Sequence, residues 1–147
     1  MAKMKFFLAL AAAASLIGCS EPDAGSLLQH EPIVGLPCEG CEAVFEGMPT
    51  SLSWRARIAP VDEPGEPLML KGTVRDSQGQ VAAGVVVYAY HTNAQGLYPA
   101  NDALRGTASV RHGRLRGWTK TDEQGRYQFD TIRPASYPGA NPPPQHI

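Results

Sequence analysis

The sequence predicts an all-β domain of the antiparallel sandwich type. Short stretches rich in Val, Tyr, Phe and Ile recur between clusters of Gly, Pro, Asp and Asn, and this spacing is typical of a sandwich. The 15 glycines and 13 prolines are spread between those stretches, which favours turns rather than disorder. The length of 147 residues suits one domain preceded by a targeting segment.

Three stretches carry the main strand signals. Residues 68–74 alternate between two faces, as in a strand with one buried side. The run 84–90 is apolar on both faces and suits a strand covered on both sides. Within it, Tyr88 and Tyr90 share one face and are interpreted as core or pocket-wall aromatics. Residues 115–132 predict a β-hairpin around an Asp-Glu-Gln-Gly turn.

The first residues predict export. Lys3 and Lys5 precede a short apolar run followed by small residues, as in a secretory signal. That run is shorter than the about 20 residues of a membrane span. The string Leu-Ile-Gly-Cys resembles the bacterial lipobox, which would make residues 1–18 a lipoprotein signal peptide. Cys19 would then be the acylated first residue of a lipoprotein on the periplasmic or cell-surface side. An ordinary cleaved signal with an incidental cysteine is the alternative.

Residues 19–36 are polar and interrupted by proline, and are interpreted as a tether to the folded domain at 37–147. Near the start of that domain, Cys38 and Cys41 form a C-x-x-C pair, which can be a disulfide, half a zinc site or a redox motif. A second cysteine pair and a βαβ pattern are both missing, which disfavours zinc and thioredoxin-like chemistry. Because disulfides persist outside the cytoplasm, a local structural disulfide is preferred.

The charge balance excludes several kinds of partner. Thirteen basic and fourteen acidic residues give a formal net charge of −1. This balance predicts no binding to nucleic acid, and no basic run marks a lipid-binding surface. Membrane contact is therefore expected only through the lipid anchor.

Three side chains could carry chemistry. Tyr98 follows a Gln-Gly turn behind the strand at 84–90, Tyr137 follows a Thr-Ile-Arg-Pro string, and His146 follows a run of prolines. Taken singly, each is weak evidence, because a tyrosine beside Gly and Pro is usually a loop anchor and a lone histidine is usually structural. The sequence has no G-x-S-x-G elbow, no plausible cysteine nucleophile and no paired carboxylates in a shared motif.

The order of these residues and their local strings resemble the intradiol ring-cleavage dioxygenases, the family of catechol and protocatechuate 3,4-dioxygenases. The resemblance covers residues 37–147, and the opening string PCEGCEAVFEG looks like a variant found among exported members. It implies a transthyretin-like antiparallel β-sandwich that is incomplete at its C-terminus. The matching strings are Gly84–Val87, His91–Tyr98, Thr121–Phe129, Thr131–Pro134 and Tyr137–Gly139.

In that family, two tyrosines and a His-x-His pair bind one ferric ion. The resemblance implies that Tyr98 and Tyr137 are metal-binding and catalytic tyrosinates, and that His146 is the first histidine. Phenolate is a hard anionic donor that suits Fe(III), and coordination removes the proton of a phenol whose pKa is otherwise about 10. The implied oxidoreductase inserts O₂ into a small aromatic diol, cleaves the ring between its two hydroxyl-bearing carbons, and serves aromatic compound catabolism.

Two departures keep an alternative open. The sequence ends at Ile147, before the second histidine expected next, which suggests C-terminal truncation. Well-studied members also carry an arginine where this chain has Pro143. Arg133 is interpreted as structural, and Gln145 as a hydrogen-bond donor in place of the missing arginine. The alternative is a non-catalytic transthyretin-like β-sandwich that serves as a binding module on the cell surface.

Overall fold

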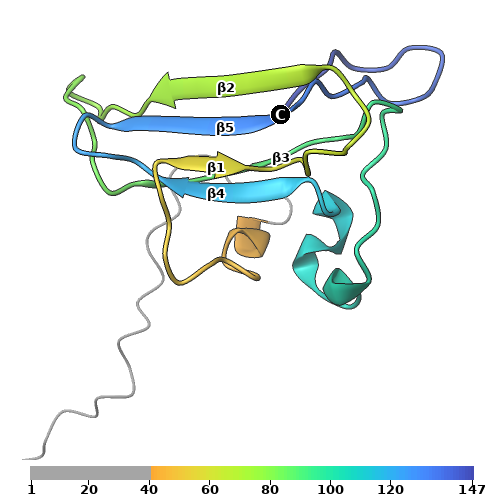
Figure 1. Ribbon diagram of the computed structural model, residues 1–147, viewed down its shortest axis with the longest axis horizontal. Helices are drawn as coiled ribbons and strands as arrows, with labels where there is room; N and C mark the ends of the chain where they lie inside the picture. Colours follow the sequence, from red (N-terminus) through yellow and green to blue (C-terminus); the bar gives the residue numbers. More distant parts are fainter. Residues whose placement is uncertain (1–40) are drawn as a thin grey trace, which may run out of the picture. The chain divides into compact units, whose positions relative to one another are not determined.

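The computed structural model describes residues 41–147. This part of the chain is all-β, as predicted, with short 3-10 helices in its connections (Figure 1). None of its helices is long and apolar enough to cross a membrane. The elements in order are η1 (Cys41–Val44), β1 (Arg55–Arg57), β2 (Pro67–Thr73), β3 (Val86–Tyr90), η2 (Asp102–Leu104), η3 (Ala108–His112), β4 (Arg116–Lys120) and β5 (Arg126–Ile132).

The strands form two sheets. One has the order β1-β5-β2, and the other pairs β3 with β4. The β2–β5 and β3–β4 pairs are antiparallel, whereas the three-residue strand β1 runs parallel to β5. The predicted strands at 68–74 and 84–90 correspond to β2 and β3. Along β2 the partly buried and exposed side chains alternate, as the sequence pattern predicted.

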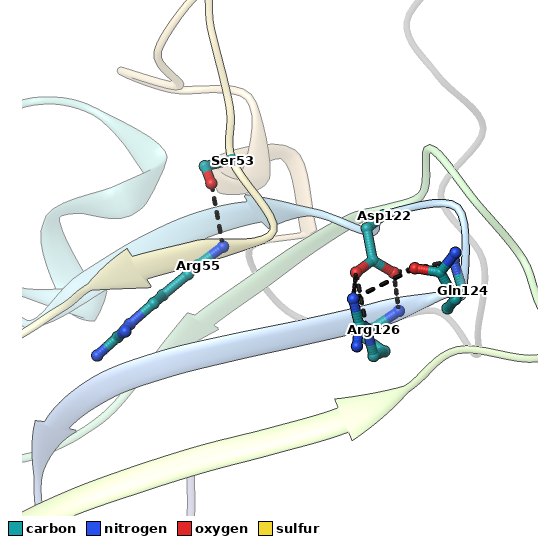
Figure 2. A network of polar contacts seen from close by, with 5 residues as sticks. All are labelled: Ser53, Arg55, Asp122, Gln124 and Arg126. Carbon is teal, nitrogen blue, oxygen red and sulfur yellow. Dashed lines mark hydrogen bonds and ion pairs between the residues drawn. The ribbon is translucent and has the colours of Figure 1, made fainter.

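The predicted hairpin at 115–132 is wrong in its pairing. Strands form on both sides of the turn, but β4 pairs with β3 while β5 pairs with β2 and β1. The chain therefore passes from one sheet to the other at this turn. Figure 2 shows how Asp122 closes it: its carboxylate accepts hydrogen bonds from the Gln124 and Arg126 backbone N–H groups at 3.0 and 2.9 Å and from Arg126 Nε at 2.8 Å.

The hydrophobic core includes residues of both sheets. Phe129 on β5 is fully buried, and Ala89 on β3 and Leu115 ahead of β4 belong to the same cluster. The partly buried Leu70 on β2 packs against it. This packing confirms an all-β sandwich arrangement for the described residues.

The segment 41–48 is tied to β4 and η3 by polar contacts. Trp118 Nε1 donates to the Val44 carbonyl at 2.6 Å, and the Glu46 carboxylate accepts from the backbone N–H groups of Ala108 and Ser109. Hydrogen bonds from Ser109 lower the pKa of Glu46 to about 2. Cys41 is disulfide-bonded. The predicted partner Cys38 lies outside the described residues, as do Cys19 and the segments 1–18 and 19–36, so these assignments stay predictions.

Candidate metal centre

The structure brings the three predicted metal ligands together. The hydroxyl oxygens of Tyr98 and Tyr137 are 2.7 Å apart, and Tyr137 Oη is 3.1 Å from His146 Nε2. The two tyrosine side chains are partly buried, whereas His146 is exposed. The segments that follow β3 and β5 lie at the same end of the two sheets, so residues far apart in the sequence meet there (Figure 1). Two phenol oxygens and one imidazole nitrogen thus form a series of neighbouring atoms, in the order Tyr98 Oη, Tyr137 Oη and His146 Nε2.

Asn93 shapes the loop that carries Tyr98. Its side-chain oxygen accepts hydrogen bonds from the backbone N–H groups of Gln95 and Leu97, each at 3.0 Å. Its own backbone N–H donates to the Leu97 carbonyl at 2.8 Å. An asparagine that satisfies nearby backbone N–H groups in this way replaces regular secondary structure with a tight turn. The backbone just before Tyr98 is therefore held in place by the hydrogen bonds between Asn93 and Leu97.

Gly96 lets this loop approach the segment that carries Tyr137. Its φ of 77° lies in the left-handed region, which glycine adopts without steric cost. A Cβ atom at this position would overlap the carbonyl oxygen of Ser136. The backbone of the 93–98 turn consequently packs directly against the residue before Tyr137. Gly96 therefore permits the close approach of the segments that carry the two tyrosines.

Side chains missed by the sequence interpretation join the two segments. His91 is buried, and its Nε2 and Nδ1 atoms lie 2.6 Å from Thr131 Oγ1 and 2.7 Å from the Thr92 carbonyl oxygen. Thr92 Oγ1 donates to the Ala135 carbonyl at 2.7 Å, and the Ala135 N–H donates to the Asn93 carbonyl at 3.1 Å. No local sequence signal marks His91, because its contact to Thr131 spans 40 residues.

Tyr88 and Tyr90 belong to an aromatic wall rather than to the hydrophobic core. Tyr90 stacks on His112, with ring centroids 3.7 Å apart, and its ring centroid is 5.8 Å from that of Tyr98. Tyr88 Oη is 2.8 Å from His112 Nδ1 and its ring lies 5.2 Å from that of Trp118. Burial raises the pKa of Tyr88. The wall therefore places the Tyr90 ring directly beside Tyr98.

The segment that carries His146 makes fewer contacts. His146 Nδ1 lies 2.8 Å from the Pro144 carbonyl oxygen, which fixes the proton on Nδ1 and leaves Nε2 facing Tyr137 as an acceptor. Arg133 Nε donates to Gln145 Oε1 at 2.9 Å, and Pro143 is exposed. The Gln145 side-chain oxygen therefore accepts from Arg133, and the hydrogen-bond donation predicted for Gln145 stays a prediction.

The environment of Tyr98 favours its protonated form when no cation is bound. Burial is the main cause that raises the pKa of Tyr98, and the hydrogen bond with Tyr137 adds to it. A cation beside the two hydroxyls would reverse this preference, because it favours the phenolate. No group of three or more His, Cys, Asp or Glu side chains in residues 41–147 could hold a metal ion, so a metal at this end would depend on the phenol oxygens.

Comparison with known proteins identifies the family. The sequence profile of a family described as Dioxygenase matches residues 50–146, which include all three candidate ligands. Catechol 1,2-dioxygenase 1 of Acinetobacter lwoffii is 38% identical to this chain over 76 residues, which are 52% of this chain and 24% of the relative. The chain belongs to the intradiol dioxygenase family.

Two further members illustrate the extent of the match. The protocatechuate 3,4-dioxygenase β chain of Burkholderia cepacia is 34% identical over 91 residues, which cover 56% of this chain and 37% of the relative. The solved structure of catechol 1,2-dioxygenase from Acinetobacter sp. ADP1 has 31% identity and a TM-score of 0.48, covering 58% of this chain and 27% of that one. The match to these intradiol dioxygenases therefore spans about a quarter to somewhat over a third of their length.

The donor set of this family member fits a ferric ion. Both phenol oxygens and His146 Nε2 are within hydrogen-bonding distance of a neighbour in the series, and His146 Nε2 is in the acceptor form that binds metals. Replacing the shared hydroxyl protons by a cation would leave two anionic oxygens and one neutral nitrogen as ligands. Hard oxygen donors of this kind suit a hard cation such as Fe(III).

Proposed function

We propose that this chain cleaves a catechol-type aromatic ring with O₂ between the two hydroxyl-bearing carbons, using Fe(III) held by Tyr98, Tyr137 and His146. The observation that carries the proposal is the series formed by the three side chains, with separations of 2.7 and 3.1 Å. The names of the relatives support a catecholic substrate. The ferric ion would supply Lewis acidity that activates the bound diol toward O₂.

The chain's own residues would position the reactants and handle protons. Tyr137 Oη contacts both the Tyr98 hydroxyl and the His146 ring, so it is the phenol best placed to accept a proton from a substrate hydroxyl. Tyr98 is held by the Asn93 turn and backed by the Tyr90 ring, which suits it to remain in place. A fixed Tyr98 and a proton-accepting Tyr137 are therefore the two roles that we assign.

The test uses isotopically labelled oxygen. Protein loaded with Fe(III) is incubated with catechol or protocatechuate under ¹⁸O₂, and the product is analysed by mass spectrometry. We expect a ring-opened diacid of the cis,cis-muconate type that carries both labelled oxygen atoms. Tyr137→Phe should abolish product formation, whereas Tyr127→Phe should not, since Tyr127 packs against the hydrophobic core. Recovery of unchanged substrate by iron-loaded wild-type protein would refute the proposal.

Pro143 supports a second candidate, a binding module that retains the fold without the chemistry. The family arginine predicted to stabilise the reacting substrate has no counterpart at this position, and Arg133 is engaged with Gln145 and with Glu66 at 3.3 Å. Such a module would bind an aromatic diol at this end of the sandwich without consuming O₂. Calorimetric binding of catechol by the protein, with no oxygen uptake, would favour it over the dioxygenase.

We also propose that the protein is exported and anchored through Cys19, with a disulfide between Cys38 and Cys41. The cationic and apolar residues ahead of Cys19 support the anchor, and the disulfide of Cys41 is consistent with an oxidising compartment. Labelling of expressing bacteria with an alkyne fatty acid should mark the wild-type protein and not Cys19→Ala. Mass spectrometry of the unreduced protein should place Cys38 and Cys41 in one cross-linked peptide.

A further inference from the structure

We propose that His91 is a positioning residue that sets the spacing between the Tyr98 and Tyr137 hydroxyls. The inference rests on the proposed function for its link to iron, but its main test needs no metal. The His91 ring nitrogens contact Thr92 and Thr131 rather than either tyrosine. His91 therefore acts on the two segments that carry the tyrosines. Its imidazole lies between the end of β3 and β5, and both ring nitrogens are engaged there.

The two contacts of the imidazole fix one tautomer. The Thr92 carbonyl oxygen can only accept, so Nδ1 carries the proton and donates to it at 2.7 Å. Nε2 therefore accepts from the Thr131 hydroxyl at 2.6 Å. His91 is 1% exposed, and burial is the main cause that lowers its pKa, which supports the neutral form. A neutral ring with one donor and one acceptor joins a backbone carbonyl on one segment to a hydroxyl on the other.

These contacts lie close to the start of both tyrosine-bearing segments. On the first side, the His91 N–H also donates to the Leu115 carbonyl at 3.1 Å, so the residue is fixed to the chain ahead of β4. On the second side, Thr131 belongs to β5 and pairs with Leu68 of β2. Thr92 and Asn93 then bond to Ala135, which continues the same junction toward Tyr137. The His91–Thr131 bond thus defines how the Tyr98 loop sits against the Tyr137 segment.

The test measures the coupling free energy between the two phenol hydroxyls in metal-free protein. Tyr98→Phe, Tyr137→Phe and the double variant are unfolded with urea in four backgrounds: wild type, Thr131→Val, His91→Gln and Thr119→Val. Thr131→Val removes the partner of His91 with little change in shape. Thr119→Val is the matched control, because Thr119 is fully buried and its Oγ1 has no hydrogen-bond partner among the described residues.

We expect the coupling to be lost in Thr131→Val and kept in Thr119→Val. His91→Gln should keep it, because its amide can still bond to the Thr131 hydroxyl. A purely structural role for His91 would lower the stability of all Thr131→Val proteins equally and leave the coupling at its wild-type value. That result, full coupling in Thr131→Val, would overturn the proposal.

A second measurement connects the inference to the metal. Titration with Fe(III) should show that Thr131→Val binds iron about 10-fold more weakly than Thr119→Val, the size of effect typical of residues that orient metal ligands. If the wild-type protein binds no Fe(III), the proposed function fails. The metal-free coupling then still decides whether His91 sets the spacing of the tyrosines. Equal iron affinity in the two variants, with wild-type binding intact, would also contradict the role of His91.

Discussion

The two tyrosines and the histidine lie close together, but the segments that carry them differ in how many contacts hold them to the rest of the fold. Residues 91–98 and 131–137, the tyrosine platform, are joined by the His91–Thr131 bond and by the contacts of Thr92 and Asn93 with Ala135. Residues 138–147, the histidine arm, are exposed. Among the described residues, no backbone hydrogen bond joins the arm to the platform, and two side-chain contacts, Arg133–Gln145 and Tyr137–His146, do so.

This difference shows which part of the site is organised before a metal binds. A ligand pair whose spacing is fixed by buried contacts loses little entropy when a cation arrives, whereas an exposed ligand must be ordered at that moment. Tyr98 and Tyr137 belong to the first kind and His146 to the second. The platform should therefore dominate the stability of the fold, while the arm should affect only what the site binds.

The largest effect should come from crowding the platform. Gly96→Ala places a methyl group against the Ser136 carbonyl and forces a side chain into the left-handed region. Overpacking and left-handed strain together should cost on the order of 3 kcal/mol of unfolding free energy, measured by urea denaturation. Gly79→Ala is the control, because Gly79 has φ of 81° with nothing within 4 Å of the added atom. Equal costs for the two variants would show that the close contact at Gly96 contributes nothing.

Removal of the hydrogen bond between the tyrosines should cost less. Tyr98→Phe deletes one partner of the 2.7 Å contact, so we expect a loss of about 1 kcal/mol in metal-free protein. Tyr127→Phe removes a hydroxyl that has no hydrogen-bond partner among the described residues and should change stability less. Urea unfolding of both variants checks the difference. A Tyr98→Phe protein as stable as wild type would mean that the tyrosines do not interact before metal binding.

Mild acid should weaken the platform through His91. Its folded pKa is lowered by burial, against smaller raising effects of Thr92 and Glu63, so the unfolded chain binds a proton that the folded chain excludes. Stability from this group is therefore complete above pH 6.5 and decreases as the pH falls below it. The unfolding free energies of wild type and His91→Gln are measured against pH. The difference between them should decrease as the pH falls below 6.5. A difference that does not vary with pH would exclude a buried neutral imidazole.

The smallest effect on stability should come from the arm. His146→Ala removes an exposed ring and should change the unfolding free energy by less than about 0.5 kcal/mol. It should nevertheless weaken Fe(III) binding by more than about tenfold. Loss of a residue that binds the metal directly should have a larger effect than loss of a residue that only orients a ligand. The adjacent Ile147→Ala variant is the control for iron affinity. A His146→Ala protein that binds iron like Ile147→Ala would remove His146 from the ligand set.

Local sequence patterns correctly predicted two strands whose residues show a clear pattern of apolar side chains. The alternation of 68–74 and the apolar run of 84–90 depend on which face is buried, and both strands formed. The turn at Asp122 was also predicted, but a turn alone does not determine whether the chain returns to the same sheet. β5 pairs with β2 and β1, which lie more than fifty residues earlier in the chain, and no local pattern contains that information.

The candidate ligands are recognisable through their resemblance to a family, and their supporting residues are not. Tyr98 and Tyr137 stand in strings that carry the family pattern, so the sequence alone is enough to name them. His91 reads locally as the start of a loop, because its function as a bridge depends on Thr131 being brought beside it by the sheet. The local string around Gly96 indicates only a turn, whereas its contact with Ser136 explains why glycine is required.

Titration of the metal-free protein with Fe(III), followed by visible absorption, tests the central claim most directly. If Tyr98 and Tyr137 are the ligands, the wild-type protein should turn red-brown through phenolate-to-iron charge transfer, and Tyr98→Phe and Tyr137→Phe should each weaken or shift that band. Tyr127→Phe should leave it unchanged. A wild-type protein that stays colourless with ferric iron, or a band that survives in the Tyr98→Phe, Tyr137→Phe double variant, would contradict the account.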